Sequence, residues 1–397
     1  MNFDKFFSDS IINLPPSPIR ELLKVSQKPG IISLAGGNPS PDTFPVWEIK
    51  LCFEKVIEEK AKRILQYSPT EGLPELIESV QELSIKDGIN CEKENILITS
   101  GSQQGMDLVC KVLLDPGDEV IVELPSYSGS LHTLRSYRAK LIGIPVDSEG
   151  LDVEMLDDIL KEKAKKGRMP KFIYTIPTFQ NPSGVTLSEE RRKKIIEIAK
   201  KYEILIVEDD PYSKLRYSGD FVKPIKTYDD EGLVVYLNSF SKIFCPGVRV
   251  AWIIASKEII RKMVIAKQGM DLHTSSLNQA IIAEFLKQGK LYPHIEKIIP
   301  YYREKRDAMV WAINEYFKER VYFTNPEGGF FTWITLKEEK DTKNEVLKAI
   351  EKGVVYVPGI SFGIGEEKGL KSSMRLSFAT VDVESIKKGV KILSEIF

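Results

Sequence analysis

Two hydroxyl side chains and a lysine stand together at the end of one strand-like run of the sequence. The run covers residues 233–240, the three residues are Ser239, Ser241 and Lys242, and Arg249 follows seven positions after the lysine. A lysine buried between apolar stretches has a lowered pKa and can form a Schiff base with a carbonyl compound. Two hydroxyls and a guanidinium close to it would bind an anion, most naturally a phosphate. A solvated lysine on an ordinary surface fits the same pattern, so this motif alone leaves both interpretations open.

Polar residues also follow two consecutive strand-like runs, 171–177 and 204–209. Asp209 closes the second run and Tyr212 follows it, whereas Asn181 stands in an Asn-Pro-Ser-Gly sequence after the first. Parallel strands place their ligands at their carboxyl ends, so these three side chains are candidates for one binding site. The alternative is a pair of ordinary turns, because Asn-Pro-Ser-Gly is a favourable turn sequence and aspartate is common in turns.

Two further segments contain groups that bind anions. Residues 101–105 follow the strand-like run 96–99 and open a helical pattern with Ser102 and Gln103. Free N–H groups at a helix N-terminus bind phosphate, although an ordinary turn capped by Ser102 is the alternative. Arg375 lies inside an apolar strand-like run. A buried arginine needs an anionic partner, which is either a structural salt bridge or the carboxylate of a ligand held by two hydrogen bonds.

The elements that would position these residues alternate between strands and helices from about residue 46 to 285. Helical patterns separate most of the strand-like runs, which indicates an α/β fold with a mainly parallel seven-stranded sheet. The runs cover residues 96–99, 119–124, 139–146, 171–177, 204–209, 233–240 and 250–255. We therefore expect a large α/β domain over residues 46–285. An N-terminal arm, residues 1–45, and the helices and short strands of residues 286–397 would form a smaller α+β part.

Composition excludes several classes of protein. The 397 residues carry 56 basic and 57 acidic side chains, and this net charge of −1 argues against a main partner that is nucleic acid or an anionic membrane. Three histidines and four cysteines without a CxxC or CxxH pair predict no metal site and no disulfide framework. The N-terminus lacks the apolar region of a signal peptide and no run of 18 apolar residues occurs, so we expect a cytoplasmic protein.

Together, these groups match what the chemistry of pyridoxal 5'-phosphate (PLP) requires. A lysine amine holds the aldehyde of this cofactor, and an aspartate keeps the pyridine nitrogen protonated so that the ring can accept electrons. An asparagine and a tyrosine could hydrogen-bond the phenolic oxygen of the ring. The helix N-terminus, the serines and the arginine would anchor the phosphate.

The order and the amino-acid sequences of the motifs resemble those of the class I/II aminotransferases of fold type I. The resemblance is strongest to the subgroup of 2-aminoadipate, kynurenine and aromatic aminotransferases. The resemblance extends over essentially the whole chain, and its motifs are specific only in combination. They include ISLAGGNPSPDTFP (32–45), LQYSPTEGLPELI (65–77), ITSGSQQGMDL (98–108), PTFQNPSGVT (177–186), VEDDPYSKLRY (207–217), NSFSKIFCPGVRVAW (238–252) and PEGGFFTWI (326–334).

The resemblance implies a role for each site residue. Lys242 would bind PLP covalently and move protons, Asp209 would pair with the pyridine nitrogen, and Tyr127 would stack on the ring. Asn181 and Tyr212 would contact the ring oxygen. Tyr67 would reach the phosphate of the neighbouring subunit, which implies a homodimer with shared active sites. The expected phosphate ligands are Ser102, Gln103, Ser239, Ser241 and Arg249, and the expected substrate ligands are Arg375 on the α-carboxylate, Asn181, Gly37, and Arg20 on a mobile N-terminal helix.

The activity that the resemblance implies is a ping-pong transfer of an amino group from an L-amino acid to a 2-oxo acid such as 2-oxoglutarate. Expected donors are 2-aminoadipate and aromatic amino acids, with branched-chain amino acids and glutamate as further candidates. A PLP-dependent β-lyase or decarboxylase on the same fold would use the same lysine and aspartate, so the cofactor motifs leave this alternative open. We do not expect a DNA-binding regulator, because the aminotransferase-like pattern begins at about residue 17 and the net charge is −1.

Overall fold

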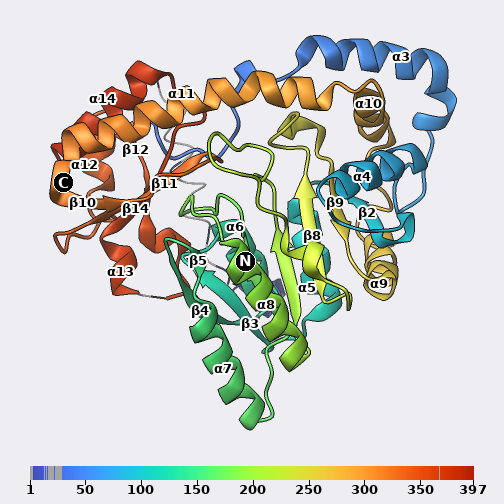
Figure 1. The fold of residues 1–397 in the computed structure, drawn as a ribbon, viewed down its shortest axis with the longest axis horizontal. Coiled ribbons are helices and arrows are strands. Elements are labelled where there is room, and N and C mark those ends of the chain that lie inside the picture. The colour runs from blue at the N-terminus through green and yellow to red at the C-terminus, as the bar shows by residue number, and fades with distance from the viewer. Residues whose placement is uncertain (1–2, 13, 15, 17–21, 23–28, 366) are drawn as a thin grey trace.

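The computed structural model describes residues 3–12, 14, 16, 22, 29–365 and 367–397, and Figure 1 shows three β-sheets with helices around them. All seven predicted strands form, and they join one large sheet. An eighth strand of two residues, not predicted, extends its edge by an antiparallel hairpin. The order is β2(Ile96–Thr99), β9(Ala251–Ile254), β8(Val234–Ser239), β7(Leu205–Asp209), β6(Phe172–Thr175), β3(Glu119–Leu124), β4(Lys140–Asp147) and β5(Gly150–Leu151).

The large sheet is mainly parallel, as predicted. The pairs β3–β4, β3–β6, β6–β7 and β7–β8 are parallel, whereas β9 runs antiparallel to both β8 and β2. Parallel strands are buried on both faces, which explains their nearly continuous apolar sequences. Neighbouring residues along β7 therefore enter different cores, with Val207 in one and Ile206 in the other.

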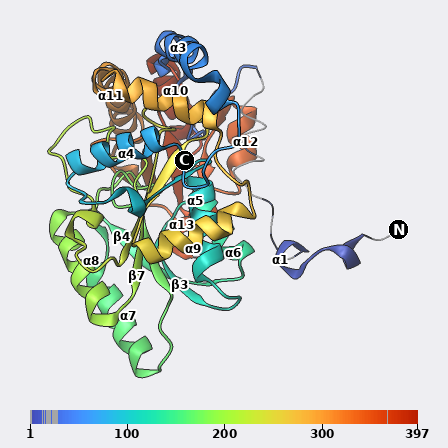
Figure 2. The same cartoon turned by 90° about the vertical axis from the view of Figure 1, so that its right-hand side faces the viewer.

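Helices cover both faces of the large sheet. One core contains apolar residues of α5(Ser102–Leu113), α6(Ser128–Ser136) and α9(Lys257–Gln268), and the opposite core contains those of α7(Val153–Lys165) and α8(Glu189–Tyr202). Figure 2 shows α7 and α8 on the side of the sheet away from α5, α6 and α9. Ser188 caps α8, because its side chain accepts a hydrogen bond from the backbone N–H of Arg191.

The C-terminal part contains a second, antiparallel sheet. Its order is β10(Val321–Phe323), β11(Phe331–Leu336), β14(Ser373–Ser377) and β13(Val357–Pro358). A parallel pair, β1(Ile32–Ser33) with β12(Val354–Val355), joins the segment near the N-terminus to this part of the molecule. The pairing agrees with a unit made of residues 1–45 and 286–397, and these domain boundaries remain a prediction.

One long helix connects the large α/β part of the chain to the C-terminal part. Figure 1 shows α11(Leu291–Phe317) extending from α10(Ser276–Lys287) to α14(Val383–Ser394). Its 27 residues span about 40 Å. The other α-helices are α1(Asp9–Ile12), α3(Val46–Ile64), α4(Pro74–Lys86), α12(Val346–Glu351) and α13(Lys368–Lys371). The short 3-10 helices are η1(Asp4–Phe6), η2(Pro41–Thr43), η3(Lys93–Asn95), η4(Ile225–Tyr228), η5(Pro246–Val248), η6(Lys318–Arg320) and η7(Gly359–Phe362).

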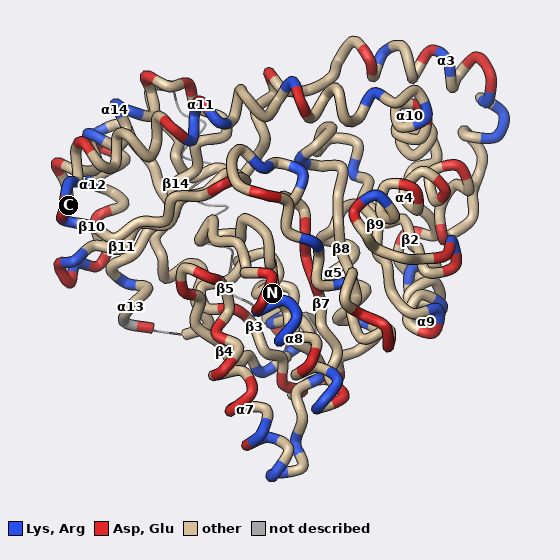
Figure 3. The backbone as a smooth tube through the Cα atoms, viewed as in Figure 1, with Lys and Arg blue, Asp and Glu red and all other residues tan. Residues whose placement is uncertain are grey.

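Basic and acidic residues are mixed along the described part of the chain (Figure 3). Figure 3 shows basic and acidic residues interspersed along the backbone, in keeping with a net charge of −1. Within the described residues, no helix combines the length and the apolar character that crossing a membrane requires.

Candidate active site

The strand order brings the predicted site residues together. Strands β8, β7, β6 and β3 are consecutive neighbours in the large sheet, and all four are parallel. Their carboxyl ends therefore lie side by side at one edge, which is where α/β sheets bind ligands. The segments that leave this edge carry Lys242 after β8, Asp209 at the end of β7, Asn181 after β6 and Tyr127 after β3.

Lys242 is partly buried at this edge. Its Nζ donates a hydrogen bond to the carbonyl oxygen of Gly37 at 3.1 Å. The same Nζ lies 5.7 Å from the ring centre of Tyr212 and 5.8 Å from that of Phe330. Burial lowers the pKa of the lysine to about 8, and the positive charges of Arg375 and Arg249 act in the same direction, while Asp209 opposes them. A good part of the amine is therefore neutral near pH 8 and able to act as a nucleophile.

Asp209 is a buried acid in which one carboxylate oxygen is hydrogen-bonded and the other is not. Its Oδ2 accepts a hydrogen bond from the hydroxyl of Tyr174 at 2.8 Å, whereas its Oδ1 is buried without a partner. Burial raises the pKa of Asp209 to about 7, against the hydrogen bond from Tyr174. Oδ1 could accept a hydrogen bond from a cationic N–H group of a ligand, which would favour the ionised form.

Arg375 lies in β14 and is almost completely buried. Its Nη1 donates to Oδ1 of Asn181 at 2.8 Å and its Nη2 donates to the carbonyl oxygen of Ala35 at 2.6 Å, whereas its Nε is buried without a partner. The guanidinium lies 4.2 Å from the ring centre of Phe331 and 4.9 Å from that of Phe362.

Burial also lowers the pKa of this arginine without removing its charge. It lowers the pKa of Arg375 to about 10, so the guanidinium is still charged at neutral pH. No carboxylate in the described part of the chain forms an ion pair with it. The structural salt bridge considered from the sequence is thus not formed there, and a buried charge without an acidic partner is suited to an anionic ligand.

Tyr212 and Asn181, predicted as a pair, are in contact. The amide side chain of Asn181 hydrogen-bonds the phenol of Tyr212, and burial raises the pKa of this phenol far above its usual value. Tyr212 also meets the rings of Phe330 and Phe331 edge-on, with centroids 5.7 and 5.9 Å apart. Tyr212 is thus held as a neutral hydrogen-bonding group beside Lys242.

The predicted phosphate ligands form a cradle of small groups. The hydroxyl of Ser239 donates to that of Ser241 at 2.9 Å, and the backbone N–H of Ser241 donates to Ser239 at 3.0 Å. Gly101 has a φ of 86° and lies directly before α5, whose first backbone N–H groups have no partner within the helix. A Cβ atom on Gly101 would collide with Nη2 of Arg249, so a larger residue would have to displace this guanidinium and would also be strained at the positive φ.

Three of the predicted residues differ from the rest. The side chain of Gln103 donates to the hydroxyl of Thr133 at 2.6 Å, so this amide is engaged with α6. Tyr67 is 78% exposed and meets the ring of His273 edge-on, so one chain by itself leaves it at the surface. Arg20 lies outside the described residues.

Several buried groups at the site were missed by the sequence analysis. Tyr174 donates to Asp209 and Ser130 donates to Tyr174, while Glu123 and Gln180 join the segments that carry Tyr127 and Asn181. A signal for them exists, because a tyrosine or a glutamate inside an otherwise apolar buried strand needs a hydrogen-bonding partner.

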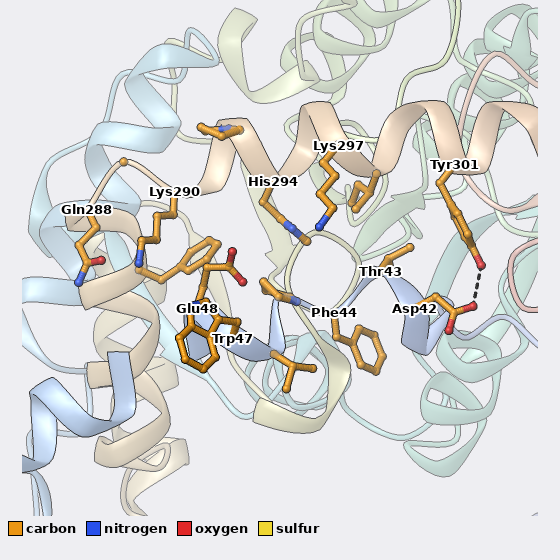
Figure 4. Close-up of a pocket in the computed structure, with 16 residues that line it drawn as sticks. Asp42, Thr43, Phe44, Trp47, Glu48, Gln288, Lys290, His294, Lys297 and Tyr301 are labelled. Carbon is orange, nitrogen blue, oxygen red and sulfur yellow. Dashed lines mark hydrogen bonds between the residues drawn. The ribbon is translucent and has the colours of Figure 1, made fainter. Parts of the chain in front are cut away.

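A separate cavity of about 630 Å³ lies between η2–α3 and the junction of α10 with α11. Figure 4 shows Trp47, Lys290, His294 and Lys297 around it, and a hydrogen bond from the Tyr301 hydroxyl to Asp42 at 3.1 Å at one end. None of the predicted site residues lines this cavity. Across the described residues, histidine, cysteine and acidic side chains form no cluster of three or more that could hold a metal ion.

The site residues fit PLP. The amine of Lys242 is available for an aldehyde, and the unpaired Oδ1 of Asp209 is suited to a protonated ring nitrogen. The helix N-terminus and guanidinium next to Gly101 are suited to a phosphate, and the unpaired Nε of Arg375 is suited to a substrate carboxylate.

Comparison with known proteins agrees with this assignment. A family model described as "Aminotransferase class I and II" matches residues 29–393. Aromatic-amino-acid aminotransferase 1 of Thermococcus litoralis is 45% identical over 396 residues, which are 100% of this chain and 94% of that protein.

Two solved structures are similar along their whole length. The kynurenine aminotransferase of Pyrococcus horikoshii, in complex with PMP, has a TM-score of 0.96 and 44% identity, and the match covers 100% of this chain and 97% of that one. The α-aminoadipate aminotransferase LysN of Thermus thermophilus, complexed with N-(5'-phosphopyridoxyl)-L-leucine, has a TM-score of 0.91 and 37% identity, covering 100% and 98%. The chain therefore belongs to the aminotransferase class I and II family and is a PLP-dependent transaminase.

Proposed function

We propose that the enzyme transfers the amino group of 2-aminoadipate and of aromatic amino acids to a 2-oxo acid such as 2-oxoglutarate, with branched-chain amino acids and glutamate as further donors. The observation that carries this proposal is the environment of Arg375. Its guanidinium lies close to the rings of both Phe331 and Phe362, with no acidic partner among the described residues. A carboxylate recognised there would have an aromatic surface beside it, which suits apolar side chains. The relatives are named as aromatic, kynurenine and α-aminoadipate aminotransferases, and these names support the same donors.

Each site residue has a proposed role. PLP, when bound, supplies a carbonyl group for the amine and a ring that accepts the electron pair left at the substrate Cα. Lys242 holds the cofactor until substrate arrives, and its amine then carries the proton that leaves Cα, for which a pKa of about 8 is suitable. Asp209 keeps the proton on the ring nitrogen through Oδ1. Arg375 orients the substrate through its carboxylate.

The remaining residues hold the cofactor. Tyr127 is proposed to cover the ring, and Asn181 and Tyr212 to bond its phenolic oxygen. The proposed phosphate ligands are Ser102, Gln103, Ser239, Ser241 and Arg249. The backbone of Gln103 is the group available for this purpose, since its amide side chain bonds Thr133.

The substrate proposal is tested by half-reactions with one amino acid at a time. Purified holoenzyme receives 2-aminoadipate, phenylalanine, leucine or glutamate without any oxo acid, and its absorbance spectrum is recorded. A donor converts the PLP spectrum to that of pyridoxamine phosphate and releases one oxo acid per site. A β-lyase or decarboxylase, which no observation favours, would form product and keep the PLP spectrum. Failure of both 2-aminoadipate and phenylalanine as donors would contradict the proposed substrate class.

Arg20 and Gly37 complete the proposed substrate site. The carbonyl of Gly37 accepts a hydrogen bond from Lys242, so this loop lies next to the reacting amine. Arg20 would pair with the distal carboxylate of 2-aminoadipate or glutamate and would swing away for aromatic donors. This dual use of one arginine accounts for both substrate types.

We further propose a homodimer in which Tyr67 enters the partner's site. Its support is the 78% exposure of a tyrosine that the family resemblance assigns to a phosphate. Mixed dimers of a Lys242→Ala chain and a Tyr67→Ala chain would contain one site with both residues intact. Their activity should exceed that of either parent enzyme. A monomeric enzyme, or mixed dimers without recovered activity, would count against shared sites.

We also propose a reducing, cytoplasmic compartment, supported by four buried cysteines that are all free thiols.

A further inference from the structure

The buried Tyr174 links Asp209, the proposed partner of the PLP ring nitrogen, to helix α6 on one face of the large sheet. Tyr174 is completely buried in the middle of β6. Its hydroxyl donates to Oδ2 of Asp209 at 2.8 Å and accepts a hydrogen bond from the hydroxyl of Ser130, also at 2.8 Å. Ser130 lies in α6 and is itself buried. The three groups form a continuous chain from α6 to the site.

The sheet register explains why this contact forms. Tyr174 pairs with Val207 across the parallel ladder of β6 and β7. Asp209 lies two residues farther along β7 on the same face, which is the diagonal position that a long aromatic side chain can reach. The contact therefore depends on two neighbouring strands of the large sheet and does not depend on a flexible loop.

The hydrogen bond makes the two oxygens of Asp209 different from each other. Oδ2 is occupied by Tyr174, and Oδ1 remains as a buried acceptor without a partner. The bond also favours the ionised carboxylate, because it lowers the pKa of Asp209 against burial and against the negative charges of Asp210 and Glu123. Burial raises the pKa of Tyr174 well above its usual value, so its hydroxyl stays a donor at any working pH.

We infer that Tyr174, oriented by Ser130, is a positioning residue that fixes Oδ2 of Asp209 and leaves Oδ1 as the atom that meets the ring nitrogen of PLP. The inference rests on the proposed role of Asp209 and adds the group through which that carboxylate is aimed. A purely structural tyrosine would contribute only packing and one satisfied hydroxyl.

The first test uses Tyr174→Phe in the holoenzyme. The ring and its packing remain, and only the hydroxyl is lost. We expect the dissociation constant for PLP to rise and kcat to fall, each by about tenfold, since a hydrogen bond to a charged group is broken. KM should change less than threefold, because Arg375 and the substrate pocket are untouched. Ser130→Ala should shift PLP affinity and kcat in the same direction by a smaller factor.

A matched control separates positioning from packing. Tyr356 is equally buried, and its hydroxyl donates to the backbone carbonyl of Thr342 in the C-terminal part. Tyr356→Phe should lower the melting temperature without changing PLP affinity or the cofactor spectrum. If Tyr174→Phe behaves in this way too, the inference is overturned. Should Tyr174→Phe not fold, Ser130→Ala carries the same comparison.

A double-mutant cycle with Asp209→Asn isolates the link. If Tyr174 acts through Asp209, Tyr174→Phe added to Asp209→Asn should weaken PLP binding less than twofold further. Full additivity of the two losses would show that Tyr174 acts by another route and would overturn the inference. If Asp209→Asn alone binds PLP and turns over like the wild type, the proposed role of Asp209 fails, and the inference fails with it. If Asp209→Asn is impaired and Tyr174→Phe is not, only the link fails.

Discussion

The guanidinium of Arg375 donates to Oδ1 of Asn181 at 2.8 Å, and 194 positions separate these residues in the sequence. This hydrogen bond joins strand β14 of the four-stranded antiparallel sheet to the segment that follows β6 of the large sheet. Together with the hydrogen bond to Ala35 it orients the planar group, while Nε stays buried without a partner. The proposed carboxylate clamp is therefore oriented by contacts from both parts of the chain without a substrate.

Replacing Arg375 should impair the handling of amino acids far more than cofactor binding. Arg375→Lys keeps the charge and loses the planar fork, which normally forms two parallel hydrogen bonds with a carboxylate. We expect kcat/KM for the amino donor to fall about 10- to 100-fold, the equivalent of one or two hydrogen bonds to a charged group. Steady-state kinetics and a cofactor spectrum of the variant measure both effects. A variant with unchanged kcat/KM would remove Arg375 from the substrate site.

Lys242→Ala should abolish turnover, by more than about a thousandfold, because both the covalent attachment and the proton carrier are lost. PLP can still bind through the phosphate cradle and the acid at its ring nitrogen. Borohydride reduction followed by peptide mass spectrometry should find the cofactor on Lys242 in the wild type and on no peptide in the variant. Lys140→Ala, at an exposed lysine of β4, serves as the control with wild-type activity. An active Lys242→Ala enzyme would rule out the proposed mechanism.

The free enzyme should capture PLP faster as the pH rises. The pKa of Lys242 is lowered to about 8, so the neutral amine that attacks the aldehyde becomes the main form above this pH. The rate of reconstitution, followed by absorbance, should increase up to about pH 8 and then level off. Arg375→Ala removes a positive charge that lowers this pKa and should move the midpoint to higher pH. The exposed Arg168→Ala should leave the midpoint in place, and equal midpoints in all three proteins would contradict the electrostatic account.

Glu123 joins two segments that carry site residues. It is buried and accepts hydrogen bonds from the hydroxyl of Thr175, from the backbone N–H of Ile176 and from the amide of Gln180, which also donates to the carbonyl of Pro125. Glu123→Gln replaces an acceptor by a donor and should lower the free energy of unfolding by about 1–3 kcal/mol, since a buried partner is left unsatisfied. The positions of Tyr127 and Asn181 should loosen at the same time, and PLP affinity should decrease.

The stability difference between wild type and Glu123→Gln should depend on pH. Burial raises the pKa of Glu123 above the value of 4.5 that it has in an unfolded chain. The folded state then retains a proton that the unfolded state loses, so the contribution of the neutral acid is full below pH 4.5 and is lost as pH rises through the folded-state pKa. The difference in melting temperature between wild type and Glu123→Gln should narrow as the pH rises. The exposed Glu94→Gln should show no such trend, and a widening gap would mean that Glu123 is ionised in the folded protein.

Arg20→Ala should alter substrate choice. If Arg20 pairs with a distal carboxylate, kcat/KM for 2-aminoadipate and glutamate should fall about tenfold or more, as expected for the loss of a charge-assisted hydrogen bond. Phenylalanine and leucine should be affected less than threefold. Competition assays with both donor types measure the ratio directly. Equal losses for the two types would refute the dual use of this arginine.

Much of the fold and of the site could be predicted from local signals. Apolar runs identified the seven long strands, because a strand that is buried on both faces must be apolar along its length. The lysine, the acid and the glycine-rich turn could be recognised because each stands where a strand ends or a helix begins, and these boundaries are written in neighbouring residues. The two-residue strand β5 was missed, since two residues carry no periodicity.

The amino-acid sequence by itself determined which chemical groups the protein possesses and which strands and helices carry them. Only the tertiary structure decided which groups meet. It placed Asn181 against Arg375, the carbonyl of Gly37 against Lys242, and Tyr174 against Asp209. These contacts arise from strand order, register and the packing of two sheets, which depend on many distant residues at once. No local pattern could therefore show that Arg375 has no acidic partner in the described chain, or that one oxygen of Asp209 is hydrogen-bonded and the other is buried without a partner.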